Sequence, residues 1–181
     1  MNNMKLPPIE SLSKDVQEKL KSLPEVNLYK RLAILEKSFI PILDVFNSFY
    51  TKDSNMPPKL REIAILRVGR NTGSSYEVHQ HKLVSKSTGL ASQDVNYILI
   101  ENEVTQLSKT ENLVCKAVDE FTSYFSLTEE TQEEFYSLLP TKTVMELILL
   151  ISMYTGLACF IKGTDVQIET DNPLKGKNTP L

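Results

Sequence analysis

Apolar positions recur along the chain at spacings of three and four residues, a pattern that predicts helices rather than strands. Residues 28–49 follow this spacing, and Pro41 is expected to kink or split the helix that they form. The next apolar run, KLREIAILRVGR, follows a Pro-Pro pair and stops at an Asn-Thr-Gly turn, and both are typical boundaries of a helix. The pattern therefore indicates an all-α protein.

Capping signals mark four further helices. A serine pair can cap a helix over residues 74–87, which a glycine can end in the left-handed conformation. Ser108 and Glu111 have the spacing of a capping box ahead of another amphipathic segment. A short helix over 94–100 and an acidic helix over 128–139 complete the set.

The most apolar segment of the chain is VMELILLISMYTGLACFI, residues 144–161, which at 18 residues reaches the lower edge of membrane-spanning length. No second hydrophobic segment or flanking basic loop supports a membrane span. We therefore expect a central core helix or a subunit interface. The predicted organisation is an N-terminal arm over 1–27, one helical domain over 28–164, and a polar, mobile tail over 165–181.

Composition and charge narrow the class of protein. The chain has 181 residues, of which 41% are hydrophobic and 24% charged, and this fits one globular domain. A formal net charge of -3 offers no excess of Lys and Arg, so neither nucleic acid nor a membrane surface is an expected partner. The first residues lack the apolar run of a secretory signal, so we expect a cytoplasmic protein. Cys115 and Cys159 lie too far apart for a CxxC pair and are expected to be buried.

Candidate chemistry is concentrated in SSYEVHQH, residues 74–81, which holds both histidines of the chain. On a helix Ser74, Glu77 and His81 share one face, while His79 points to nearly the opposite side. Glu77 and His81 are spaced for a hydrogen bond in which the carboxylate fixes the imidazole tautomer. The alternative is an exposed pair with little energetic consequence. An HxH pair cannot converge on one ion and HExxH is absent, so no metal or cofactor is expected.

Two segments, Leu60 to Ile98 and Met145 to Glu169, resemble the carboxymuconolactone decarboxylase family, which includes the alkylhydroperoxidase D-like proteins. The first segment is the more specific match. Its motifs are REIAILR, TG and YE, followed by a histidine four residues after the glutamate of YE and by a glycine eight residues after that histidine. The resemblance implies an all-α bundle of orthogonally packed helices. It also implies a homo-oligomer, a trimer or hexamer.

In the redox-active branch of that family, a glutamate, a CxxC pair and a histidine form a proton relay. Glu62 and His81 match the glutamate and the histidine, whereas Ser74 and Glu77 occupy the two cysteine positions. Serine and glutamate cannot form a disulfide or a sulfenic acid, so the resemblance implies a relay without its redox centre.

The resemblance to the decarboxylase branch implies a cofactor-free lyase, isomerase or hydrolase that acts on a small carbonyl, carboxylate or lactone compound. His81 is then the general acid/base, Glu77 its orienting partner, Glu62 a second carboxylate and Ser74 a hydrogen-bond donor. Candidate substrate-binding residues are Tyr76, Arg67, Arg70 and Tyr154. Two alternatives stay open: an antioxidant oxidoreductase that uses Cys115 and Cys159, and a non-catalytic oligomeric binding protein.

Overall fold

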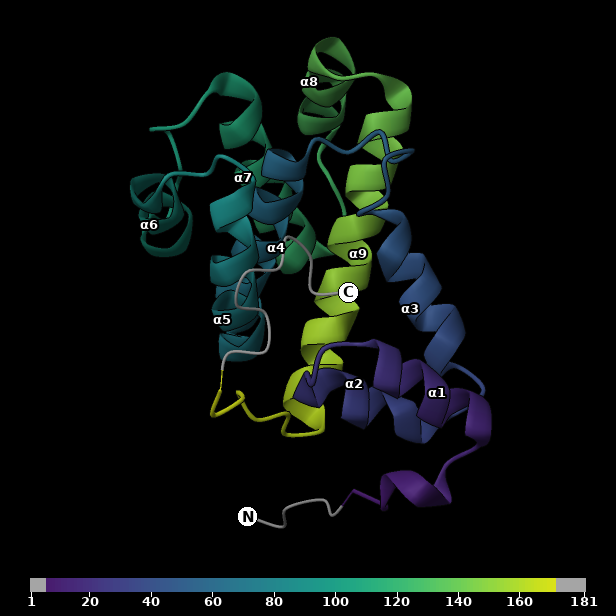
Figure 1. Ribbon diagram of the computed structural model, residues 1–181. Helices are drawn as coiled ribbons and strands as arrows, with labels where there is room; N and C mark the ends of the chain where they lie inside the picture. The colour runs from purple at the N-terminus through teal and green to yellow at the C-terminus, as the bar shows by residue number, and fades with distance from the viewer. Residues whose placement is uncertain (1–5, 172–181) are drawn as a thin grey trace.

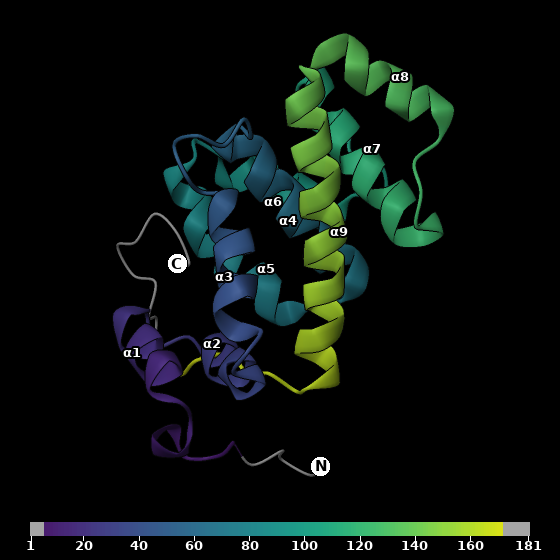
Figure 2. The ribbon, with the colours of Figure 1, turned by 90° about the vertical axis from the view of Figure 1, so that its right-hand side faces the viewer.

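A computed structural model of the chain describes residues 6–171, and this part of the chain is helical without any strand. It contains nine α-helices, drawn in Figures 1 and 2, and three short 3-10 turns. The all-α prediction is confirmed. The elements are η1 (Ile9–Ser11), α1 (Lys14–Ser22), α2 (Asn27–Leu32), η2 (Ala33–Leu35), α3 (Phe39–Ser48), α4 (Pro58–Thr72), α5 (Ser75–Val84), η3 (Ser85–Ser87), α6 (Ser92–Ile100), α7 (Lys109–Tyr124), α8 (Glu129–Leu138) and α9 (Thr141–Gly163).

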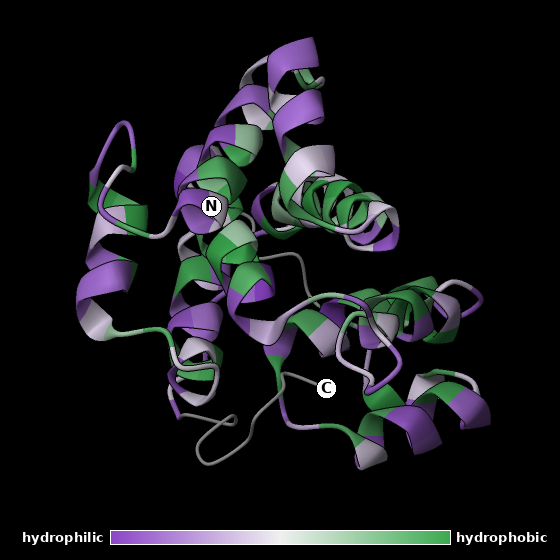
Figure 3. Cartoon of the chain, turned by 90° about the horizontal axis from the view of Figure 1, so that it is seen from above, coloured by the Kyte–Doolittle hydropathy of each residue, from purple (hydrophilic) through white to green (hydrophobic). Residues whose placement is uncertain are grey.

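Helix α4 lies at the centre of the molecule. Residues 60–69 of this helix are all buried, and α5, α6, α7 and α9 pack around it. Hydrophobic residues gather where the helices face one another, as the view from above shows (Figure 3). Because every face of α4 is covered, its polar side chains must find their partners inside the protein.

Helix α9 runs beside α4 along most of the height of the molecule (Figure 1). Its inner face is buried, but Met145 and Leu149 on its outer face are 57% and 50% exposed. By length and composition, α9 is the one helix of residues 6–171 that qualifies as a candidate membrane span. A buried core helix passes the same test, and the inner face of α9 has that role here.

Two glycines set the geometry between α4 and α5. Gly73 adopts the left-handed conformation, with φ of 66°, and ends α4 as the Asn-Thr-Gly signal predicts. Gly69 faces α5, where an added Cβ atom would lie 2.9 Å from Cγ2 of Val78. The absence of a side chain at Gly69 therefore allows the two helices to approach closely, and this brings the polar residues of both into contact range.

The predicted helix over residues 28–49 is divided, but not at Pro41. The chain turns between α2 and α3 near Glu36, which has a φ of 25°. Pro41 lies in the first turn of α3, where the backbone N–H that proline lacks would have no helical partner anyway. The prediction of a break at Pro41 is therefore wrong, because the break lies near Glu36.

Helices α1 and α2 form a second layer over one end of α5 and α9, and α3 rises from it beside α9 (Figure 2). Residues of these helices share an apolar cluster with α5 and α9. Residues of the predicted N-terminal arm belong to this layer, since Val16 and Val26 are buried. The start of the predicted mobile tail is also packed: Val166 is buried, and Glu169 accepts a hydrogen bond of 2.6 Å from the backbone N–H of Asn27. Residues 1–5 and 172–181 lie outside the described part of the chain.

Candidate functional site

The closest pair of candidate residues is Glu62 on α4 and His81 on α5. Oε2 of Glu62 lies 2.8 Å from Nδ1 of His81, and the two residues are 0% and 4% exposed. In the neutral imidazole this contact places the proton on Nδ1, which leaves Nε2 as a proton acceptor. A carboxylate that orients an imidazole in this way is a common element of acid/base sites.

The other oxygen of Glu62 is bound by its neighbour in the sequence. Nε of Arg61 donates a hydrogen bond of 2.9 Å to Oε1 of Glu62, and Nη1 of Arg61 donates one of 3.1 Å to the carbonyl of Phe49. The guanidinium also lies 3.9 Å above the ring of Tyr50, in a cation–π contact. Glu62 therefore has a compensating positive charge inside the core, as a buried carboxylate requires.

Glu77, on the same helix as His81, is in a different state. It is 2% exposed, and neither of its carboxyl oxygens has a hydrogen-bond partner. Burial raises the pKa of Glu77 to about 8, and the nearby Ser74 hydroxyl lowers it slightly without a well-formed hydrogen bond. Near neutral pH Glu77 is therefore mainly a protonated acid.

The structure corrects the role expected for Glu77. The sequence spacing made Glu77 the orienting partner of His81, but the hydrogen bond to the imidazole comes from Glu62 on the adjacent helix. The close approach of α4 and α5 at Gly69 permits this contact between helices. Glu77 is left as a separate acid near the imidazole rather than a part of its support.

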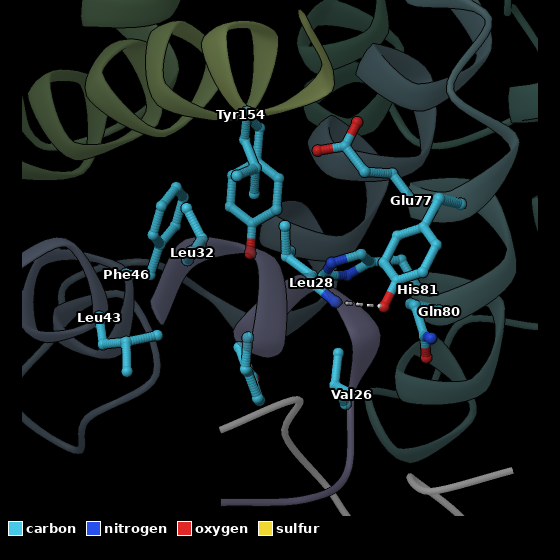
Figure 4. A pocket seen from close by; sticks show the side chains of 12 residues that line it. Val26, Leu28, Leu32, Leu43, Phe46, Glu77, Gln80, His81 and Tyr154 are labelled. Atoms are coloured by element: carbon cyan, nitrogen blue, oxygen red, sulfur yellow. Dashed lines mark hydrogen bonds between the residues drawn. The ribbon is translucent and has the colours of Figure 1, made fainter. Parts of the chain in front are cut away.

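Glu77 and His81 line one cavity of about 50 Å³ (Figure 4). By the usual allowance of about 10–15 Å³ for each water, this space holds roughly four water molecules. Its walls are mostly apolar and come from four helices and the segment before α2. The lining residues are Val26, Leu28, Tyr29, Leu32, Leu43, Phe46, Tyr76, Glu77, Gln80, His81, Tyr154 and Leu157.

Tyr154 of α9 contributes a phenol to this cavity. Its hydroxyl lies 2.9 Å from that of Tyr50, and its ring contacts the His81 ring edge-on at a centroid distance of 5.4 Å. Burial raises the pKa of Tyr154 well above its usual range, so the phenol stays neutral. Tyr154 thus links the imidazole to the stacked pair of Arg61 and Tyr50.

Tyr76 lines the cavity and also anchors the C-terminal segment. Its hydroxyl donates to Oε1 of Glu169 at 2.6 Å and accepts from the backbone N–H of Leu28 at 3.2 Å. Gln80, one turn further along α5, also donates to Glu169. These contacts hold the start of α2 over the cavity.

Arg67 and Arg70 do not line the cavity. Arg67 is fully buried and binds Asp119 at 2.6 Å, together with the backbone carbonyls of Ile98, Glu101 and Asn102. The side chain of Arg70 binds Asn71 and the segment after α6. Five residues separate Arg67 from Glu62, a rotation of about 140° around the helix, so Arg67 faces α7 instead of α5.

The remaining sequence candidates lie outside the cavity. His79 is exposed, and Ser74 is buried behind the lining with its hydroxyl unpartnered. Cys115 is buried on α7, as expected, and burial raises the pKa of its thiol to about 12. The expected burial is wrong for Cys159, which is exposed on α9. Within residues 6–171, no three His, Cys, Asp or Glu side chains are grouped as a metal site.

Several residues of the site had not been selected from the sequence. Arg61 carries a visible signal, because an Arg-Glu pair inside an otherwise apolar run needs internal partners. The cavity wall formed by Val26, Leu28 and Tyr29 has no such signal, since apolar residues before and within an amphipathic helix are ordinary core positions. Glu169 lay in a segment expected to be mobile.

Comparisons with known proteins support the fold. No family model matches the chain, and no curated protein does. Two solved structures are similar to it over nearly its full length. One is an alkylhydroperoxidase AhpD core, an uncharacterized peroxidase-related protein from Ralstonia eutropha JMP134, with a TM-score of 0.82, 11% identity, and coverage of 99% of this chain and 97% of that one. The other is an uncharacterized peroxidase-related protein from Silicibacter sp. TM1040, with a TM-score of 0.79, 13% identity, and coverage of 93% and 92%. The chain thus has the AhpD-like fold.

Proposed function

We propose that this AhpD-like protein is a cofactor-free acid/base enzyme, similar to the carboxymuconolactone decarboxylases, that acts on a small carbonyl compound or lactone. One observation carries the proposal: an imidazole oriented by a buried carboxylate and a separate protonated carboxylic acid line the same cavity. An imidazole and a protonated carboxylic acid that line the same cavity are typical of acid/base catalysis.

The roles follow from the contacts. Nε2 of His81 removes a proton from the carbon next to the carbonyl, and the electron pair of that C–H bond passes to the carbonyl oxygen. Glu77 donates its hydrogen bond or its proton to that oxygen, so negative charge does not accumulate. The imidazolium then returns the proton to the same carbon or to another one. Return to another carbon, with the enol proton passed back to Glu77, gives an isomerase. In a lyase the enol proton also returns to Glu77, and the enol electrons expel a leaving group from the β-carbon, which departs with its bonding pair and takes the proton of the imidazolium.

Glu62 is a positioning residue in this proposal. It holds Nδ1 of His81 at 2.8 Å and carries the negative charge that stabilises the imidazolium after proton transfer. Arg61 donates a hydrogen bond of 2.9 Å to the other oxygen of Glu62 and so holds this carboxylate in place. Tyr154 and Tyr76 shape the cavity beside the reacting atoms.

Thiol-dependent peroxide reduction has less support in this chain. Cys115 is buried with a raised pKa, and Cys159 is exposed on a different helix. A peroxidatic thiol needs a lowered pKa and access to its substrate. A non-catalytic binding protein would retain the same cavity, and only turnover separates it from the enzyme.

We also propose that the protein is a homo-oligomer, a trimer or hexamer, in which α9 contributes to the subunit interface. Of the most apolar stretch of 18 residues in α9, only 39% is buried within one chain. Apolar surface on a core helix is usually covered by a partner. Sedimentation velocity tests this, and a monomer at micromolar concentration would contradict it.

Proton exchange tests the enzymatic proposal without knowledge of the natural substrate. In D2O, the protein is expected to accelerate deuterium incorporation next to the carbonyl of acetone or γ-butyrolactone, followed by proton NMR. His81→Gln should lower the protein-dependent rate by about 100-fold or more, the usual contribution of a general base. His79→Gln, the same change on the exposed face, should leave the rate unchanged. Equal rates for wild type and His81→Gln would contradict the role of His81.

A further inference from the structure

The geometry points to a ligand class for this cavity: we propose that it binds small uncharged molecules with a hydrogen-bond acceptor and rejects carboxylates of the same shape. The inference rests on the proposed function and narrows it. A decarboxylase acts on a carboxylate, so rejection of carboxylates leaves isomerase or non-decarboxylating lyase chemistry on an uncharged carbonyl compound or lactone.

The first support is the charge of the cavity wall. No Lys or Arg is among the residues that line it in the described part of the chain. Two cations are sequence neighbours of Glu62 and His81. Lys82 is exposed, and Arg61 already binds Glu62, the Phe49 carbonyl and the Tyr50 ring. A bound carboxylate would therefore enter a mostly apolar space beside Glu77 with no Lys or Arg to pair with, and such burial is strongly unfavourable.

The second support is a set of buried polar groups that have no partner. Both carboxyl oxygens of Glu77, Oγ of Ser74 and Oε1 of Gln80 make no hydrogen bond, although each atom is buried. Buried polar groups of folded proteins are almost always paired, and each exception calls for an explanation such as a catalytic role or a bound partner. The protonated Glu77 is a donor that lacks an acceptor, and a carbonyl oxygen of a ligand would supply one.

Size and wall chemistry complete the description of the ligand. A cavity of about 50 Å³ accepts roughly four to six non-hydrogen atoms. Leu28, Leu32 and Leu157 give apolar contact around the carbon atoms of such a molecule. The matched probes are thus acetamide and acetate, which have nearly the same shape and differ in charge.

The inference predicts a dependence on pH that belongs to Glu77. Its pKa is raised to about 8, so the donor is lost above that pH. The tyrosines that surround it stay neutral, because burial raises the pKa of each well above the usual range. Several other titratable and charged groups face the cavity or lie behind its wall. They are Arg61 and Glu62 on α4, Tyr76 and His81 on α5, Tyr29 on α2, Tyr154 on α9, Tyr50 after α3 and Glu169 after α9.

Ligand titration followed by methyl NMR tests the inference, with the Leu and Val methyl groups of the cavity wall as reporters. Acetamide is expected to bind near neutral pH and acetate is not. Acetamide affinity should fall about tenfold between about pH 7 and pH 9, as the protonated fraction of Glu77 falls. In Glu77→Gln, which stays neutral, acetamide should bind with the same affinity at both pH values. His81→Gln should retain the wild-type pH dependence.

Each other outcome overturns the inference. Acetate that binds as tightly as acetamide would contradict the exclusion of charge, and absence of acetamide binding near neutral pH would contradict the ligand class. A pH dependence that persists in Glu77→Gln would assign it to another group. These binding results do not depend on turnover. If the wild-type protein binds acetamide as expected but does not accelerate deuterium exchange, the proposed function is contradicted while the ligand class is retained.

Discussion

Replacement of Glu77 by glutamine is expected to stabilise the protein, and increasingly so as the pH rises. The carboxyl group has a pKa of about 8 when folded and of 4.5 as a free side chain. Below pH 4.5 both states hold the proton, and Glu77 has no effect on stability through its ionisation. Above that pH the unfolded chain releases the proton while the folded protein retains it, so the free energy of unfolding falls until the folded group also ionises near pH 8.

The size of the effect follows from the difference between the two pKa values. Each pKa unit corresponds to about 1.4 kcal/mol, which gives a penalty of roughly 1 kcal/mol at pH 5, about 3 kcal/mol at pH 7 and about 5 kcal/mol at pH 9. Because Glu77 is 2% exposed, solvent screening reduces these values little. Glutamine has nearly the same shape and does not ionise, so Glu77→Gln removes the penalty.

Urea unfolding of the wild type and Glu77→Gln across this pH range measures the difference directly. A matched control is Glu133→Gln, the same change at an exposed position of α8, which should have no such pH dependence. A constant difference between wild type and Glu77→Gln from about pH 5 to pH 9 would refute the argument, because it would mean that Glu77 ionises alike in both states.

Three further changes test how the site is held together. Gly69→Ala should destabilise the protein by about 1–3 kcal/mol and slow proton exchange, because the added Cβ would lie 2.9 Å from Val78. In Gly156→Ala the added Cβ meets no atom within 4 Å, so this variant should be more stable than wild type by roughly 1 kcal/mol. Urea unfolding compares the two variants. Glu62→Gln should cost about 3–5 kcal/mol of stability, since it leaves a buried guanidinium unpaired, and should lower the exchange rate. Glu169→Ala should speed hydrogen exchange of the α2 amides, because three hydrogen bonds to its carboxylate are lost.

Each of these predictions has a distinct refuting result. Equal stability of the two alanine variants would mean that α4 and α5 do not need their close approach. An unchanged free energy of unfolding in Glu62→Gln would mean that the Arg61–Glu62 ion pair does not stabilise the core. Unaltered α2 exchange in Glu169→Ala would mean that apolar contacts alone hold the second layer, with Asp165→Asn as the exposed control on the same segment.

Helix boundaries were predictable where local chemistry sets them. The Pro-Pro pair before α4 and the glycine after it act through backbone geometry, which does not depend on distant residues. Ser108 and Glu111 form the capping box that their spacing predicts. Pro41 was misinterpreted because proline is disruptive inside a helix but tolerated in its first turn, and the boundary of α3 is set by packing against the rest of the molecule.

The amino-acid pattern alone predicted the helical class, most helix limits, and one helix face that carries Ser74, Glu77 and His81. Glu62 was associated with this face only through the family resemblance. Which carboxylate orients His81 depended on the crossing of two helices, because residues on different helices meet only where packing brings their backbones close. The acid state of Glu77 also required the complete fold, since its raised pKa comes from burial, and burial is the combined effect of side chains distant in the sequence.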